Sequence, residues 1–189
     1  MLFVSYHERY PIIETLPVIK GVCFGEQMKL LCYAKTAYIK DVGFLFDLQK
    51  FERDPIVKDI DIINEHDSIA AISFNFAGKD SSPTVTINLN AAGCNTVYAD
   101  AVELPSLLDV TAYKGNDEQG WYWGVRFIIS NEMLNSIYGD ISFAPGMHIN
   151  GSIYAYLLDH AREHFVSFAP FCNQHVSSFL NHSEFIISI

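Results

Sequence analysis

The stretch from Asp67 to Cys94 constrains the fold more than any other part of the sequence. Apolar and polar side chains alternate in residues 72–76 (ISFNF) and again in 84–90 (TVTINLN), with a polar segment between them. Successive side chains of a strand point to opposite faces, so this pattern predicts a hairpin with one apolar face. That face needs a second layer to cover it, which favours stacked sheets.

Other short apolar segments are expected to add strands around this hairpin. They are 18–22, 28–34, 42–46, 95–98, 107–113, 121–129, 147–158, 165–168 and 185–189. Residues 47–65 are rich in charge and predict a long surface connection, and 114–120 predicts a turn. One short helix is expected near 131–138, capped by Asn131 and ended by Gly139.

Roughly nine to eleven short strands with almost no helix predict an all-β fold. We expect a two-sheet antiparallel β-sandwich, jelly-roll or immunoglobulin-like, as a single domain over residues 1–189. The composition supports a packed core, because 50% of the residues are hydrophobic and 14% are aromatic. Disordered chains have few aromatic residues and many charges.

Charge and hydropathy exclude several classes of partner. The formal net charge of -10 repels phosphate backbones and anionic membrane surfaces, so neither nucleic acid nor a membrane is expected as a partner. No run approaches the roughly 18 apolar residues of a membrane span. The first residues lack the pattern of a signal peptide, so the expectation is a cytoplasmic protein, or a secreted one only if a signal was removed.

Sequence motifs for catalysis and metal binding are sparse. The four cysteines (Cys23, Cys32, Cys94 and Cys172) are widely separated, which favours buried thiols and leaves disulfides open. His160 and His164 would share a helix face and could bind metal, but a solvated loop is favoured. Carboxylate pairs at 59/61 and 100/103 could serve a glycosidase, but charged loops are the favoured interpretation. We therefore expect no metal, no cofactor and no catalytic residue.

Aromatic side chains are concentrated in the last third of the chain. Half of those on alternating strands must face the core, and the other half can form a stacking platform. Sugar rings pack their C–H faces on aromatic rings while their hydroxyls bond to polar neighbours. Core packing remains the more frequent role for such residues.

Several of these segments also resemble a known family. Residues 67–76 (DSIAAISFNF) and 87–93 (INLNAAG) look like the "DS…EFFxNF…Y.NFE.NAxG" region of family 9 carbohydrate-binding-module-like (DOMON-like) domains. Residues 121–129 (WYWGVRFII) are similar to its "W…EIAIPF" strand. Residues 164–168 (HFVSF) resemble its "HFLSWNPI" run, with Phe168 in place of Trp, and 183–185 (SEF) resemble its closing "PEFFG". The resemblance spans about Leu16 to Ile189.

The resemblance implies a β-sandwich that binds a poly- or oligosaccharide without catalysis. The side chains nearest the family motifs are the candidate carbohydrate-binding residues: Trp121, Trp123, Arg126, Tyr154, His164 and Phe168. Arg126 and His164 are expected to bond hydroxyls. Trp121 and Trp123 share a strand face, so they are expected to be buried or exposed together.

Two alternatives remain open beside sugar binding. The first is an interaction or structural protein that kept the sandwich and lost the sugar site. It would expose an apolar patch and form a homodimer. The second is a hydrolase, which requires two carboxylates across a cleft and ranks last.

Overall fold

The computed structural model describes residues 2–24, 32–159, 162–168 and 183–189 of the chain. Most regular structure in those residues is strand, with one α-helix and one short 3-10 helix. The elements are β1 (Leu2–His7), η1 (Ile13–Thr15), β2 (Ile19–Lys20), β3 (Val22–Phe24), β4 (Cys32–Ile39), β5 (Gly43–Lys50), β6 (Ile69–Asn75), β7 (Val85–Asn90), β8 (Asn95–Ala99), β9 (Val102–Leu104), β10 (Val110–Asp117), β11 (Gly120–Ser130), α1 (Asn131–Tyr138), β12 (His148–Leu157), β13 (His164–Ser167) and β14 (Ser183–Ser188).

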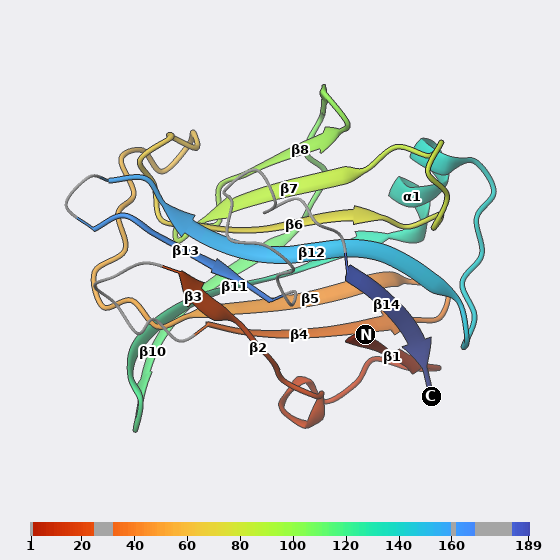
Figure 1. The fold of residues 1–189 in the computed structure, drawn as a ribbon, viewed down its shortest axis with the longest axis horizontal. Coiled ribbons are helices and arrows are strands. Elements are labelled where there is room, and N and C mark those ends of the chain that lie inside the picture. Colours follow the sequence, from red (N-terminus) through yellow and green to blue (C-terminus); the bar gives the residue numbers. More distant parts are fainter. Residues whose placement is uncertain (1, 25–31, 160–161, 169–182) are drawn as a thin grey trace.

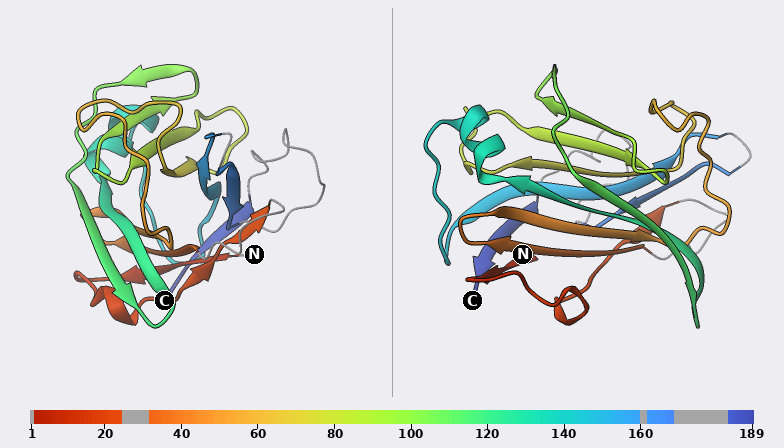
Figure 2. Two further views of the ribbon diagram at one scale, coloured as in Figure 1. Left: turned by 90° about the vertical axis from the view of Figure 1, so that its left-hand side faces the viewer. Right: turned by 180° about the vertical axis from the view of Figure 1, so that it is seen from behind.

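The strands form two layers that face each other (Figures 1 and 2). The first layer has the order β10-β11-β5-β4-β1, and β2 pairs with the first half of β4. The second layer has the order β14-β12-β6-β7-β8-β9. Opposite β6, the strand β12 pairs first with β14 and then with β13, which in turn pairs with β3. The predicted all-β sandwich with one short helix is confirmed.

The first and last strands join the two layers into one curled sheet. β1 lies between β4 and β14, with Ser5 beside Ala37 and Phe3 beside Ile186. Both pairings are parallel, whereas the other described pairings are antiparallel. Parallel partners need no hairpin between them, so they can lie far apart in the sequence. The two chain ends consequently lie close together (Figure 1).

Alternating apolar side chains fill the space between the layers. Val85, Ile87 and Leu89 of β7 are fully buried, as the sequence pattern predicts. The rings of Phe46 on β5 and Phe74 on β6 meet across the core, with centroids 5.4 Å apart. Neither ring is exposed, and burying a phenylalanine side chain contributes about 1.5–3 kcal/mol.

The outer face of the first layer is covered over only half its length. Ile13 and Leu16, in and beside η1, pack against Ala37, Ile39 and Leu45 on the back of β4 and β5. Because both faces of β5 are buried there, its sequence shows no alternation. The other half of this face, toward the turn between β10 and β11, stays partly exposed.

Three local predictions differ from the structure. β5 runs on to Lys50, into the segment predicted to be a surface connection, and β10 continues to Asp117 through part of the predicted turn. Ser130, rather than Asn131, caps α1, because its Oγ accepts a hydrogen bond from the backbone N–H of Met133 at 3.1 Å. Gly139 ends α1 as predicted, with φ of 77°. No helix in the described part of the chain is long and apolar enough to cross a membrane.

Candidate functional site

The side chains predicted to bind sugar do not converge on one site. Trp121 and Trp123 lie at the start of β11, on the face that continues the core. Arg126 lies on the opposite face of the same strand, where it pairs with Asp47 of β5 at 3.2 Å. The structure therefore separates the tryptophans from Arg126 by the thickness of the sheet.

Phe168 is packed in the core, whereas Tyr154 is half-buried in a stack of aromatic rings on β12 and β13. The Tyr154 ring lies nearly parallel to Tyr156 and Phe165, at centroid distances of 6.2 and 6.0 Å. Burial raises the pKa of Tyr154 above its ordinary value. Phe168 is 6% exposed and belongs to the core. Neither side chain offers a ring face at the Trp121 end of β11.

His164 is also buried, and it lies in β13 rather than on a helix. Its Nδ1 lies 2.7 Å from the backbone oxygen of Arg162, which can only accept, so Nδ1 carries the proton. His160, its proposed metal-binding partner, lies outside the described residues. Among the residues described, no group of three or more His, Cys, Asp or Glu side chains is placed to hold a metal ion.

The two tryptophans differ sharply in exposure. Trp123 is completely buried, whereas 53% of Trp121 is exposed. The prediction that they would be buried or exposed together is wrong, because the β10–β11 hairpin extends past the edge of the opposite layer (Figure 1). Trp123 still has a layer above it. Trp121, two residues nearer the turn, does not.

The exposed indole borders a hollow of about 200 Å³ at this end of the sandwich. Charged and aromatic side chains of two segments line it, one following β5 and the other from the β10–β11 hairpin. We call it the Trp121 hollow, and its lining residues are Glu52, Arg53, Asp54, Pro55, Lys114, Trp121, Tyr122 and Trp123. It combines one exposed aromatic ring with charged hydrogen-bonding groups.

Behind the hollow, four donors converge on the buried carboxylate of Glu52. Oε1 accepts from Ser68 Oγ at 3.0 Å and from Arg162 Nη2 at 2.8 Å. Oε2 accepts from Trp123 Nε1 and lies next to Lys50 Nζ, both at 3.1 Å. Lys50 Nζ also lies 5.6 Å from the centre of the Trp123 ring. The network fixes the floor of the hollow and the position of the buried indole.

Burial and charge shift the pKa values of this network in identifiable directions. Burial alone would raise the pKa of Glu52, but Lys50 and the hydrogen bonds from Trp123, Lys50 and Ser68 outweigh it and hold the pKa below its usual value. Burial lowers the pKa of Lys50, although Glu52 opposes that shift. Burial, with Lys50 nearby, also lowers the pKa of His164. Glu52 is thus the ionised centre of the network.

The connection that carries Glu52 and Pro55 is tied down by residues of the family-like motifs. Asp67 Oδ1 accepts from the backbone N–H of Lys58 at 2.8 Å, and its Oδ2 accepts from the side-chain amide of Asn90 at 3.0 Å. Ser68 Oγ accepts from the backbone N–H of Ile56 at 2.9 Å. The "DS" and "NAxG" positions therefore shape the wall of the hollow without reaching it.

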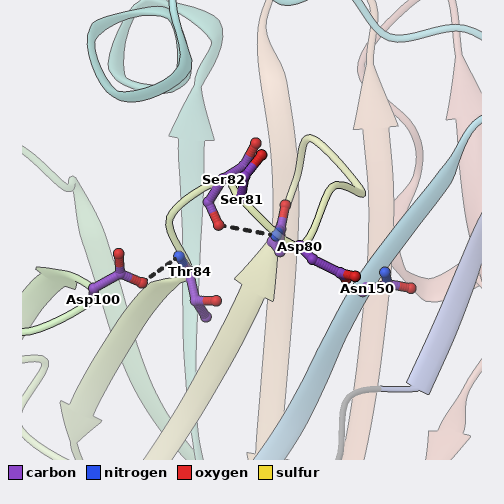
Figure 3. A pocket seen from close by; sticks show the side chains of 7 residues that line it. Asp80, Ser81, Ser82, Thr84, Asp100 and Asn150 are labelled. Carbon is purple, nitrogen blue, oxygen red and sulfur yellow. Dashed lines mark hydrogen bonds between the residues drawn. The ribbon is translucent and has the colours of Figure 1, made fainter.

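A larger hollow of about 470 Å³ lies at the other end of the sandwich (Figure 3). Its lining is polar and contains no aromatic side chain: Asn75, Asp80, Ser81, Ser82, Thr84, Asp100 and Asn150. Asp100, one of the carboxylates considered for catalysis, accepts a hydrogen bond from the backbone N–H of Thr84 at 2.8 Å. Asp59 likewise accepts one from the N–H of Asp61 at 2.9 Å, which makes that pair a local turn.

The charged residues that build the Trp121 hollow were not among the predicted site residues. Lys50 and Glu52 continue the series Phe44, Phe46 and Leu48, all two residues apart and all buried. That period of two was the available signal that their side chains point inward. Nothing in the sequence indicated that a residue as distant as Arg162 would complete the network.

The strand arrangement is similar to that of solved carbohydrate-binding proteins. A family 9 carbohydrate-binding module from Caldicellulosiruptor kristjanssonii in complex with cellotriose is 10% identical, with a TM-score of 0.64 over 99% of this chain and 93% of that chain. The chain has the fold of a family 9 carbohydrate-binding module. A family 9 carbohydrate-binding module from the same organism in complex with glucose is also 10% identical, with a TM-score of 0.64 over 99% of this chain and 95% of that chain.

A further similar structure is a candidate carbohydrate-binding protein from Bacteroides uniformis ATCC 8492. It is 10% identical, with a TM-score of 0.68 over 91% of this chain and 87% of that chain. At the level of sequence, no protein-family model and no curated protein matches the chain. The module fold accordingly rests on the course of the backbone, and the ligand has to be argued from the chain's own side chains.

Proposed function

We propose that this chain is a non-catalytic carbohydrate-binding module and that its ligand binds in the Trp121 hollow. The observation that carries the proposal is the half-exposed indole of Trp121 beside Lys114 and Asp54. A sugar offers an apolar C–H face to the ring and hydroxyls to the charged groups around it. The likeness of the fold to modules bound to cellotriose and glucose supports this class of ligand.

The chemistry of Glu52 supports binding rather than hydrolysis. A glycosidase needs a carboxylic acid with a raised pKa that can protonate the leaving oxygen. Glu52 is the buried carboxylate at the hollow, and both of its oxygens face two donors each. Those donors lower its pKa, so it holds no proton to give near neutral pH.

The size and exposure of the hollow predict a small ligand unit and modest affinity. Pockets for drug-sized ligands begin at about 300 Å³, and this hollow has about 200 Å³. A tryptophan buries about 150–250 Å², so covering its exposed half removes about 100 Å² from water, which contributes about 2.5 kcal/mol. Ordering costs oppose that gain, so dissociation constants in the micromolar to millimolar range are expected.

Calorimetric titration with a panel of soluble neutral oligosaccharides, including glucose and cellotriose, tests the proposal. Wild type is expected to bind at least one, and Trp121→Ala to weaken that binding by about 10- to 50-fold. Tyr10→Ala, which removes another exposed aromatic side chain (57% exposed), is the matched control and should bind as wild type does. No heat with any sugar, or equal binding by Trp121→Ala, would refute the assignment.

A further inference from the structure

Residues of four neighbouring strands form a row across the open half of the first layer's outer face. Tyr33 of β4 lies beside Gln49 of β5, which lies beside Gly124 of β11, which lies beside Tyr113 of β10. Neighbouring strands are about 4.8 Å apart, so this row extends about 14 Å across the sheet. The row runs perpendicular to the strands.

Two tyrosine rings in this region lie over glycines. A Cβ at Gly124 would meet the Tyr113 ring at 2.3 Å, and a Cβ at Gly115 would meet the Tyr122 ring at 2.4 Å. Each ring therefore occupies the space that its neighbour's missing side chain leaves. Both rings are half-buried, and the Arg126 guanidinium lies 5.7 Å from the centre of the Tyr113 ring.

Further aromatic rings make the row continuous. The centroid distances are 6.4 Å from Tyr113 to Tyr122, 5.4 Å from Tyr122 to Phe51 and 5.3 Å from Phe51 to Tyr33. Gln119, in the turn between β10 and β11, accepts a hydrogen bond from the Tyr33 hydroxyl. The hairpin turn is thereby held against β4, which closes one end of the row.

A row of polar groups runs beside the rings. Asp47 is 8% exposed and accepts from Tyr113 Oη at 2.6 Å and from Arg126 Nη2 at 3.2 Å. Arg126 Nε is buried and has no partner among the described residues. The amide of Gln49 likewise makes no side-chain hydrogen bond within the described ranges, and Lys35 Nζ donates to the backbone oxygen of Ile13 at 3.0 Å.

We call this surface the tyrosine strip: Tyr33, Lys35, Asp47, Gln49, Tyr113, Tyr122 and Arg126. A hollow of about 190 Å³, lined in part by Tyr33, Asp47 and Gln49, opens on it. We propose that the tyrosine strip is a second binding site, which takes a neutral, linear glycan chain lying across the four strands. Its ligand class rests on the proposed function.

The charges on the strip select a neutral ligand. Asp47 and Arg126 neutralise each other, and the Lys35 ammonium is held by backbone oxygens. The net charge of -10 disfavours a polyanion. The half-buried tyrosine rings stack on sugar rings, while the Gln49 amide bonds hydroxyls. A peptide strand would instead add to a sheet edge, and the strip lies on a face.

Tyr122 borders both the strip and the Trp121 hollow, but Gln49 and Tyr113 line only the strip and Trp121 lines only the hollow, so variants of these three residues can separate the two sites. Affinity electrophoresis in gels containing hydroxyethyl cellulose, xyloglucan, xylan or galactomannan provides the test. The proteins compared are wild type, Gln49→Ala, Tyr113→Ala, Trp121→Ala and the control Tyr10→Ala. Gln49→Ala removes no described side-chain hydrogen bond, so its fold is expected to be intact even if Tyr113→Ala is destabilised.

In the gel that retards wild type most, Gln49→Ala and Tyr113→Ala are each expected to raise the apparent Kd about fivefold or more. Tyr10→Ala should match wild type, and Trp121→Ala should keep the part of the retardation that the strip supplies. If Gln49→Ala and Tyr113→Ala are retarded as strongly as wild type and only Trp121→Ala loses retardation, the tyrosine strip is not a binding site and the proposed function still holds. No retardation of wild type in any gel would overturn both.

Discussion

Replacing Glu52 by Gln removes the charge on which the buried network converges while keeping the side chain's shape. Lys50, Trp123, Ser68 and Arg162 all direct donors at its two oxygens. A glutamine offers one oxygen, and its NH2 group turns a second donor toward at least one of these groups. The largest destabilisation is expected at Lys50, because only 1% of its side chain is exposed and water cannot replace the lost counter-ion.

The size of the effect follows from what Lys50 can do without its counter-ion. A lysine with an ordinary pKa of about 10.4 is neutralised at pH 7 at a cost of about 4.6 kcal/mol. That cost is the upper limit of the penalty for burying Lys50 without its counter-ion, because Lys50 loses its proton whenever burying the charged form would cost more. Glu52→Gln is therefore expected to lower the free energy of unfolding by about 3–4.5 kcal/mol at pH 7.

The same argument makes the penalty depend on pH. Burial lowers the folded-state pKa of Lys50. Between that pKa and about 10.4 the unfolded chain carries the Lys50 proton and the folded chain does not, so the free energy of unfolding rises as the pH rises. At pH 9 the upper limit falls to about 1.9 kcal/mol. Adding Lys50→Met to Glu52→Gln should recover most of the loss at pH 7, because the unpaired cation is gone.

Urea denaturation at pH 7 and pH 9 of wild type, both single variants and the double variant measures these energies. The control is Glu8→Gln, which breaks an exposed ion pair with Lys40 at 3.1 Å and should leave stability unchanged. A penalty that is equal at both pH values and is not relieved by Lys50→Met would refute the role assigned to the buried charge pair.

Three further predictions concern the scaffold. Lowering the pH from 7.5 to 5.5 should reduce the free energy of unfolding, because burial, with Lys50, holds the His164 pKa below about 6.5 and the unfolded chain takes up the proton first; His164→Gln should flatten this slope in urea titrations. Asp67→Ala should cost about 3 kcal/mol or more and speed hydrogen exchange at the Lys58 amide; unchanged exchange would contradict the anchoring role. Gly151→Ala places a Cβ 2.2 Å from the buried Phe74 ring, so the variant should lose about 1–3 kcal/mol of unfolding free energy and melt at a lower temperature than wild type. A melting temperature equal to that of wild type would count against the packing described.

Local patterns predicted the elements whose residues are buried on one side. The alternation in 84–90 and 121–129 corresponds to β7 and most of β11, and the single helix lies where its end signals place it. These predictions worked because side-chain direction in a strand depends on neighbouring residues alone. The parallel pairing of β1 could not be predicted from local patterns, because its partners β4 and β14 lie far from it in the sequence.

The site was harder to predict, because exposure depends on where the opposite layer ends. Trp121 and Trp123 lie on the same face of β11 by periodicity. Because the opposite layer ends between them, Trp123 is a core residue and Trp121 is an exposed candidate for ligand binding. Lys50 and Glu52 were assigned to the surface because they are charged, although their spacing after Leu48 points them inward. Their burial is stabilised by Ser68, Trp123 and Arg162, which the sequence does not show to be neighbours.

The chain has two tryptophans, so an NMR spectrum of 15N-labelled protein contains two indole N–H signals, and these test the central claim most directly. Trp123 Nε1–H is bound to Glu52 inside the protein, whereas Trp121 is half exposed. On titration with a soluble oligosaccharide that binds, the account predicts that the Trp121 signal shifts and saturates while the Trp123 signal stays in place. A saturating shift of Trp123 alone, or binding with neither signal moving, would contradict it.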